Sequence, residues 1–138
     1  MTPQIGANRS GDGNIRSADR PSVNPEFNGD RIIGTVAQWF DGNAFILPPV
    51  GTYGNLGKGE LKGPGLAAVD FSLFNNTHLT ERMELQFRSE FFNLFNRANL
   101  NFPAPIVFTG ANYNPSAGRI TRMSTTSRQI QFGMKLIF

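Results

Sequence analysis

The stretch that most limits the fold of this chain is its last one, residues 128–138. Apolar and polar side chains alternate there without interruption, up to a terminal aromatic residue. Successive residues of a β-strand point to opposite sides, so this pattern predicts a strand, whereas a helix would scatter the apolar residues around its surface. The length matches the roughly 9 to 11 residues with which a tilted strand crosses a bilayer. One continuous apolar face is expected to contain Ile130, Phe132, Met134, Leu136 and Phe138.

Composition is compatible with a transmembrane barrel without requiring one. Only every second residue of a membrane-spanning strand meets lipid, so the mean hydropathy of -0.26 does not exclude such a barrel. No apolar run approaches the roughly 18 to 20 residues of a transmembrane helix. The absence of cysteine excludes disulfides and thiolate metal sites, and the dispersed net charge of +3 gives no support for a nucleic-acid partner. Residues 1–20 lack the apolar core of a secretory signal, so we expect an outer-membrane chain of this kind to be the C-terminal piece of a longer protein.

Two more stretches, residues 66–75 and 82–92, alternate in the same way and predict further strands. The second also fits a helix, because Met83, Phe87 and Phe91 recur at helical spacing. Leu85 interrupts that helical stripe, and the flanking strands need a partner for their open edges, so a strand is favoured. The apolar positions predicted to face lipid are Val69, Phe71, Leu73, Met83, Leu85, Phe87 and Phe91. The polar positions predicted to face the barrel lumen are Asp70, Ser72, Glu84, Gln86, Arg88, Glu90, Gln131 and Lys135.

The connections between these strands are unequal in length. Residues 1–65 are dominated by Gly, Asn, Asp and Pro and are predicted to form an extracellular loop region, while residues 66–138 hold the last three barrel strands. Residues 76–81 form a short polar turn, and a long irregular span precedes the last strand. Transmembrane barrels have short periplasmic turns and long extracellular loops, and a periplasmic Phe138 puts both connections on the expected side. The predicted fold class is therefore all-β, with antiparallel transmembrane barrel strands and long loops.

No catalytic residue, cofactor or metal site is predicted. The only histidine, His78, falls in the short polar turn, where solvation explains it. Gly57 and Lys58 lack phosphate-loop spacing, because Thr52 occupies the position that requires glycine and the residue after Lys58 is not Ser or Thr. A carboxylate pair on the strand at 82–92 fits a lumen network better than a glycosidase site. We therefore expect no enzymatic activity.

Several runs in the second part of the chain resemble, in order and interval, the C-terminal end of Oar-like TonB-dependent outer-membrane receptors. These runs are GTYGNLG at 51–57, LKGPG at 61–65, VDFSLF at 69–74, LQFRSEFFNLFN at 85–96 and GRIT at 118–121, followed by the terminal Phe138. The resemblance implies a barrel of about 22 strands that takes up a substrate actively across the bacterial outer membrane. It also implies as partners the outer-membrane lipid, the remaining barrel and plug, and TonB through an N-terminal part that this chain lacks. No substrate-contacting residue can be carried over, because such contacts lie largely in the plug and outer loops.

The end of the chain allows two interpretations. In outer-membrane proteins, which this end resembles, a terminal aromatic is read by the barrel-assembly machinery, so Phe138 with Ile130, Phe132, Met134 and Leu136 is predicted to form that signal. Alternatively, Phe138 only anchors the strand in the interfacial aromatic girdle.

The island around Trp39, Phe40 and Phe45 is interpreted as a local cluster that packs a loop. The alternative function is a soluble β-rich module, for instance carbohydrate-binding, with Trp39, Phe40 and Tyr53 as stacking platforms.

Overall fold

The computed structural model describes residues 1–14 and 19–138 and divides into two compact units. The first, here called the loop unit, comprises Met1–Pro64 and Asn101–Arg122. The second, here called the sheet unit, comprises Gly65–Leu100 and Met123–Phe138. Over the described residues the structure is nearly all β, and its one helical element is the short 3-10 turn η1 (Gly42–Ala44). No helix in this part of the chain has the length and apolar character needed to cross a membrane.

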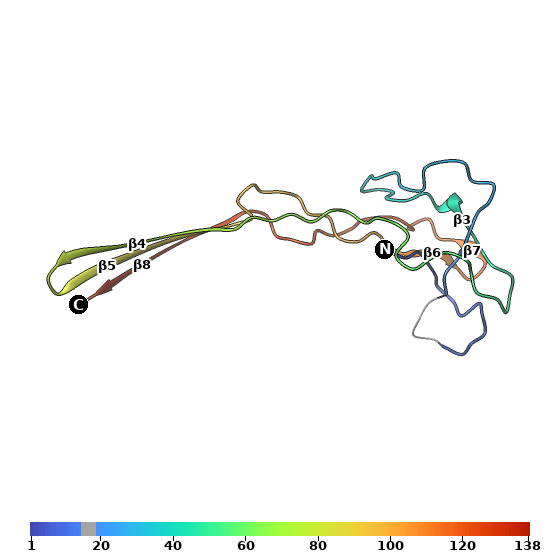
Figure 1. The fold of residues 1–138 in the computed structure, drawn as a ribbon, viewed down its shortest axis with the longest axis horizontal. Helices are drawn as coiled ribbons and strands as arrows, with labels where there is room; N and C mark the ends of the chain where they lie inside the picture. The colour runs from blue at the N-terminus through green and yellow to red at the C-terminus, as the bar shows by residue number, and fades with distance from the viewer. Residues whose placement is uncertain (15–18) are drawn as a thin grey trace. The chain divides into compact units, whose positions relative to one another are not determined.

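The sheet unit is built on three antiparallel strands in the order β4-β5-β8. These strands are β4 (Phe71–Thr80), β5 (Met83–Phe92) and β8 (Gln129–Ile137). They run side by side in Figure 1, where the chain end on β8 lies close to the turn between β4 and β5. The sheet is open, since β4 and β8 each have one edge that no described strand pairs.

The strand register separates the side chains of this sheet into two faces. Directly opposed residues of an antiparallel pair share a face, and one row joins Phe71, Phe91 and Ile130 across the three strands. On the same face Phe87 opposes Met134, whereas the row of Phe74, Arg88 and Gly133 lies on the opposite face. The period-2 pattern in the sequence therefore gives the faces that were predicted for β5 and β8.

The first predicted strand and its turn need correction. The strand predicted at 66–75 is found as β4 at Phe71–Thr80, and the turn predicted at 76–81 shrinks to residues 81–82. Residues 76–78 are polar, which suggested a turn, but their backbone pairs with β5, as Asn76 opposes Gln86 and His78 opposes Glu84. Residues 66–70 stay outside the strand. The other two predicted strands agree with β5 and β8 to within one residue at each end.

Beyond the regular ladder, three asparagines spaced three residues apart connect the strand ends. Asn93 Nδ2 donates to the Thr126 carbonyl at 2.9 Å, and Asn96 Oδ1 accepts from the Arg128 N–H at 2.9 Å. Asn99 exchanges two hydrogen bonds with the Ala67 backbone, at 2.9 and 3.0 Å, and is fully buried. Asn93 and Asn96 adopt positive φ angles of 51° and 50°, a conformation that asparagine tolerates better than other side chains do. We call Asn93, Asn96 and Asn99 the asparagine clasp.

The loop unit contains short strands and its own core, whereas only an extracellular loop region was predicted for residues 1–65. β1 (Gln4–Ile5), β6 (Ile106–Thr109) and β7 (Asn112–Tyr113) form one small sheet, and β2 (Ser22–Val23) pairs with β3 (Phe45–Ile46). The core is completed by residues more than fifty positions away along the chain, which local patterns do not reveal. Its buried members are Ile5, Phe40, Ala44, Phe45, Leu56, Leu61, Val107, Phe108 and Ala117.

Candidate functional site

The apolar face of the β4-β5-β8 sheet is the most distinctive surface of the sheet unit. On the outer strands its side chains are exposed, with Phe132 at 66% and Met134 at 72%. Aromatic rings connect the strands across this face: Phe71 and Phe91 lie 6.0 Å apart, and Phe132 lies 6.2 Å from Phe87 and 6.4 Å from Phe91. Soluble monomers rarely expose a contiguous apolar surface of this kind. The face therefore has the chemistry of a surface that contacts lipid.

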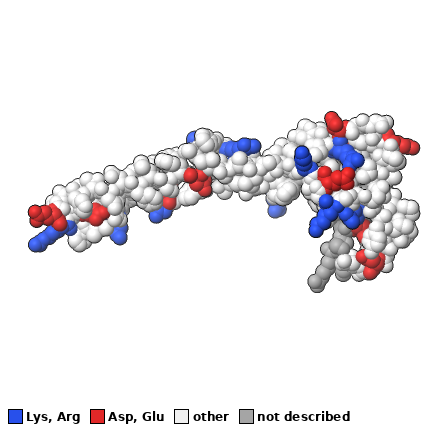
Figure 2. All heavy atoms as spheres, in the orientation of Figure 1, with Lys and Arg blue, Asp and Glu red and all other residues white. Residues whose placement is uncertain are grey.

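The opposite face carries mostly polar groups. Arg88 forms an ion pair with Glu90, and Gln86 Nε2 donates to Glu84 Oε1 at 3.3 Å. The Arg88 guanidinium also lies 5.4 Å from the ring centroid of Phe74, a cation–π contact. Figure 2 shows charged residues spread along the sheet unit in this view and gathered at the end where the β4-β5 turn lies. Paired charges of this kind suit a water-filled interior.

A hollow of about 450 Å³ lies on the polar face around Gly133. Gly133 opposes Arg88 in the register, and it offers no side chain to fill the space. A Cβ atom on Gly133 would meet the Arg88 Cβ at 3.9 Å, which is ordinary contact, so packing does not require glycine here. The rest of its lining consists of Phe74, Asn76, Gln86, Phe87, Met134 and Lys135. The polar face thus leaves room for water or for another chain segment above Gly133.

Two predicted facing residues, Val69 and Asp70, lie outside the strands. The Val69 carbonyl accepts from the Leu94 N–H at 2.8 Å, and Asp70 Oδ1 accepts from the Asn93 N–H at 2.8 Å. Asp70 therefore joins the start of β4 to the end of β5, and its role as a lumen-facing group stays a prediction. The remaining predicted positions fall on the faces assigned to them, although what each face contacts stays a prediction.

The terminal row of β8 lies on an open edge of the sheet. Phe138 follows the strand and is 94% exposed, while Ile130, Phe132, Met134 and Leu136 are exposed along it. An unpaired edge with alternating apolar side chains has the geometry needed for recognition by strand addition. The assembly role of this row stays a prediction.

Sequence reasoning missed Phe74, Gly133 and the asparagine clasp. Phe74 was given no role, and its contact with Arg88 depends on the register with β5. The clasp had a visible signature, which is asparagine at every third position directly after a strand. Asparagine at such a place suggests side-chain bonds to the backbone and positive φ.

The aromatic island of the loop unit is a packing cluster, as predicted. Phe40 is 0% exposed and packs edge-to-face on Phe45, with ring centroids 5.9 Å apart. Phe40 therefore cannot serve as a stacking platform, which removes one of the three residues on which the carbohydrate-binding alternative rested. Trp39 is half-buried against the core and donates its indole N–H to the Lys62 carbonyl at 2.9 Å.

Hydrogen bonds that involve carboxylates shift the pKa values of Tyr53 and Glu60. Glu60 pairs with Arg31 and accepts from the Gly57 N–H at 2.9 Å, and both bonds hold the pKa of Glu60 below its usual value. The Gly57 N–H is thus already used by a carboxylate of the same turn. Tyr53 donates to Asp12 Oδ2 at 3.1 Å, and this bond raises the pKa of Tyr53.

A family model described as "Outer membrane beta barrel domain" matches residues 1–131 of the chain. The matched range covers the loop unit and the sheet unit as far as residue 131, within β8. Comparisons with curated proteins and with solved structures give no match.

Proposed function

The chain belongs to the outer membrane β-barrel domain family, and from that premise we propose that it supplies the last strands of a TonB-dependent receptor that takes up a substrate. The family places the protein in the bacterial outer membrane. The observation that carries the proposal is the β4-β5-β8 sheet, in which one face is apolar and exposed and the other is polar. In this arrangement the apolar face contacts lipid and the polar face lines the lumen.

The open edges of the sheet require further strands. Unpaired backbone groups at a sheet edge are not tolerated in the hydrocarbon region of a bilayer, and three strands cannot close into a barrel. β4 and β8 therefore pair with strands of the remaining barrel, which we place in the full-length receptor together with the plug and the segment that contacts TonB. The proposed role is transport through that barrel, without a catalytic step or a nucleic-acid partner.

The finer assignment to an Oar-like receptor is supported by sequence runs whose local chemistry fits a role in the sheet unit. In the run at 85–96, β5 provides the two-faced part, and Asn93 and Asn96 provide the positive φ angles and the bonds to the returning segment. These residues hold β8 beside β5. The residues of this run therefore help to position neighbouring strands of the proposed barrel.

Single-cysteine labelling of the full-length receptor tests the proposed topology, since this chain contains no cysteine. Lys58→Cys lies in the loop unit, and Glu81→Cys lies in the β4-β5 turn. We expect a membrane-impermeant maleimide to label Lys58→Cys in intact cells, and Glu81→Cys only after the outer membrane is permeabilised. Labelling of both positions in intact cells would overturn the transmembrane placement of the sheet.

Binding of the TonB C-terminal domain tests the finer part of the proposal. The full-length receptor, purified in detergent, should retain this domain in a pull-down, and removal of its N-terminal TonB-contacting segment should abolish retention. A receptor that fails to retain the domain in any state would contradict TonB-dependent uptake, while the barrel topology would stand on the labelling result.

Deletion of Phe138 tests the proposed partnership with the barrel-assembly machinery. If the terminal row is an assembly signal, the deletion lowers the amount of receptor in outer-membrane fractions while the purified protein still refolds in detergent. If Phe138 is only an interfacial anchor, refolded stability and cellular assembly fall together and modestly. Normal outer-membrane levels on a quantitative immunoblot would remove the assembly role.

A further inference from the structure

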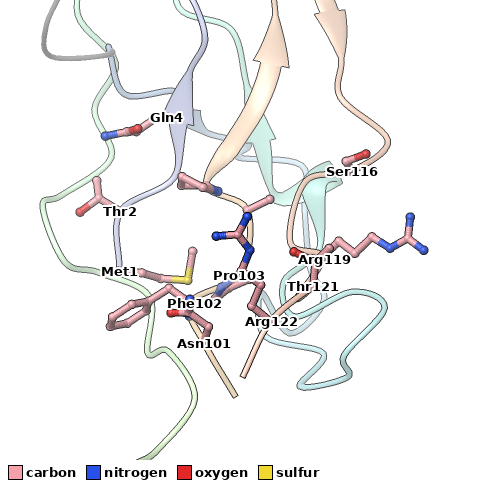
Figure 3. Close-up of a pocket in the computed structure, with 12 residues that line it drawn as sticks. Met1, Thr2, Gln4, Asn101, Phe102, Pro103, Ser116, Arg119, Thr121 and Arg122 are labelled. Carbon is pink, nitrogen blue, oxygen red and sulfur yellow. The ribbon is translucent and has the colours of Figure 1, made fainter. Parts of the chain in front are cut away.

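A cavity of about 630 Å³ opens in the loop unit between the segments 101–105 and 116–122 (Figure 3). Ligand-binding pockets commonly have about 300–1,000 Å³, so the cavity is large enough for a small organic molecule. Its wall combines the apolar side chains of Met1 and Phe102 with hydroxyl and amide groups, among them those of Thr2, Gln4 and Ser116. It thus offers both contact area for an apolar group and several hydrogen-bonding atoms.

Backbone hydrogen bonds fix the walls of this cavity. The Ala104 N–H donates to the Arg119 carbonyl and the Gly118 N–H donates to the Ala104 carbonyl, both at 2.9 Å. The Asn101 N–H donates to the Arg122 carbonyl at 3.0 Å, and β1 is joined to Pro105 by a 2.8 Å bond from the Gln4 N–H. The backbone of the site is therefore arranged before any ligand enters, which lowers the entropy cost of binding.

The charge of the wall is entirely positive. Arg119 and Arg122 line the cavity, and no lining residue is an aspartate or glutamate. In Figure 3 the Arg122 side chain lies among the lining residues, whereas the Arg119 side chain reaches outward. Among the described residues, neither guanidinium has a hydrogen-bond or ion-pair partner. A guanidinium presents five N–H donors in a fixed plane that matches carboxylate and phosphate oxygens.

We propose that this cavity binds a small anionic molecule whose carboxylate or phosphate pairs with Arg122 and whose apolar part rests on Phe102. Arg119, at the rim, raises the local concentration of anions and contributes less to the bound state. The inference rests on the proposed function only for the position of the cavity on the cell exterior. Binding itself requires only that the loop unit is folded.

Titration of the 138-residue chain in a non-ionic detergent tests the proposal. Phenyl phosphate is the probe, phenol is its neutral counterpart, and benzoate distinguishes a preference for carboxylate from one for phosphate. We expect saturable binding of at least one anion by isothermal titration calorimetry, weakening as NaCl increases because the cavity is open to solvent. Equal binding of phenol, or no saturable binding of either anion, would overturn the proposal.

Substitutions of Arg122 test whether this residue binds the anion. Arg122→Gln should weaken the affinity for the preferred anion about tenfold or more, since it removes a charged bidentate donor. Arg122→Lys keeps the charge without the planar fork and should give an intermediate affinity. Arg97→Gln is the matched control, because Arg97 is an exposed arginine of the sheet unit and its loss changes net charge equally.

The fluorescence of Trp39, the single tryptophan, checks that each variant retains a folded loop unit. If Arg122→Gln fails to fold, the affinities of Arg122→Lys and wild type for the anion are compared instead, to decide whether Arg122 binds it. Unchanged affinity in a folded Arg122→Gln, or in Arg122→Lys where Arg122→Gln is lost, would overturn the assignment. Failure here would leave the cysteine-labelling and TonB results of the full-length receptor unaffected, so the two proposals fail separately.

Discussion

The two units use the same kinds of apolar residue in opposite ways. In the loop unit Phe40 is fully buried, whereas in the sheet unit Phe132 belongs to a row of exposed side chains. The hydrophobic effect favours removal of both from water. The loop unit achieves this removal within itself, because residues 101–122 return to complete its core. The sheet unit has no described layer over its apolar face, so that face needs an apolar medium outside the chain, and lipid is the medium in the placement that we propose.

This difference predicts different responses to substitution. A change in the loop unit should act through packing, as in a water-soluble core. A change on the sheet should act through the medium that each face contacts. The free-energy cost of a substitution should therefore depend on whether the residue lies on the apolar or the polar face.

Phe40→Ala should lower the free energy of unfolding of the loop unit by about 3–5 kcal/mol, the range found when a buried phenylalanine is truncated. The reason is the cavity left beside Phe45 in a core that is otherwise closed. A urea titration of the detergent-solubilised chain, followed by Trp39 fluorescence, measures the change. Val50→Ala, at an exposed position, serves as the control and should stay within about 0.5 kcal/mol of wild type. Equal midpoints for the two variants would mean that the core is not formed as described.

Arginine substitutions on β5 and β8 test the two faces of the sheet. In a complete receptor, Phe87→Arg and Met134→Arg should each cost about 2–4 kcal/mol near the bilayer midplane. Gln86→Arg, next to Phe87, and Gln131→Arg, three positions before Met134, should cost much less, because the register puts both on the polar face that is proposed to line the lumen. Folding yield and urea stability in lipid vesicles provide the measurement. Comparable losses in both pairs would indicate that the faces are wrongly assigned.

The sheet unit was largely predictable from the sequence because the information that specifies its faces is local. Alternation with period 2 places each side chain of β5 and β8 on one of two faces, whichever strand pairs with it. Local pattern failed to give the bounds of β4, because the residue types of Asn76, Thr77 and His78 suggested a turn. Pairing with β5 satisfies their backbone groups, and tertiary context overrides the weak turn preference.

The loop unit was not predictable in the same way. Phe40 and Phe108 are far apart in the sequence, and neither lies in a periodic segment that would indicate burial against the other. The strands β1, β2 and β3 are two residues long, too short to show any period. The anion-binding cavity shares this origin, because its wall joins Gln4 to residues after position 100.

Asn99→Ala should destabilise the sheet unit by about 1–3 kcal/mol in total, because it removes three hydrogen bonds of a fully buried side chain. Asn99 serves both the N–H and the carbonyl of Ala67, and it also donates to Thr125 Oγ1 at 3.0 Å. Asn75→Ala is the control, since Asn75 is exposed and its side chain makes only a long contact of 3.4 Å with Thr77. Hydrogen exchange at the Ala67 amide in detergent should accelerate in Asn99→Ala and stay unchanged in Asn75→Ala. An unchanged rate in Asn99→Ala would remove the asparagine clasp as the link between these segments.

The Arg31–Glu60 ion pair should contribute little to the stability of the loop unit. The bonds from Arg31 and the Gly57 N–H lower the pKa of Glu60 in the folded protein. A carboxyl group with a depressed folded pKa stabilises the protein above its unfolded pKa, and this contribution disappears as the pH falls through the folded value. The stability of the loop unit should therefore decline slightly below about pH 4.5, the ordinary value of this group.

Glu60→Gln should remove that part of the decline, and the change should be small because both side chains are more than one third exposed and the pair is screened by solvent. Urea midpoints followed by Trp39 fluorescence between pH 3 and pH 7 measure the difference. Glu26→Gln removes the same charge from a residue that makes no ion pair within the described part of the chain, so it should leave the acid decline as in wild type. Identical pH profiles for wild type and Glu60→Gln would mean that the Arg31–Glu60 pair does not persist in solution.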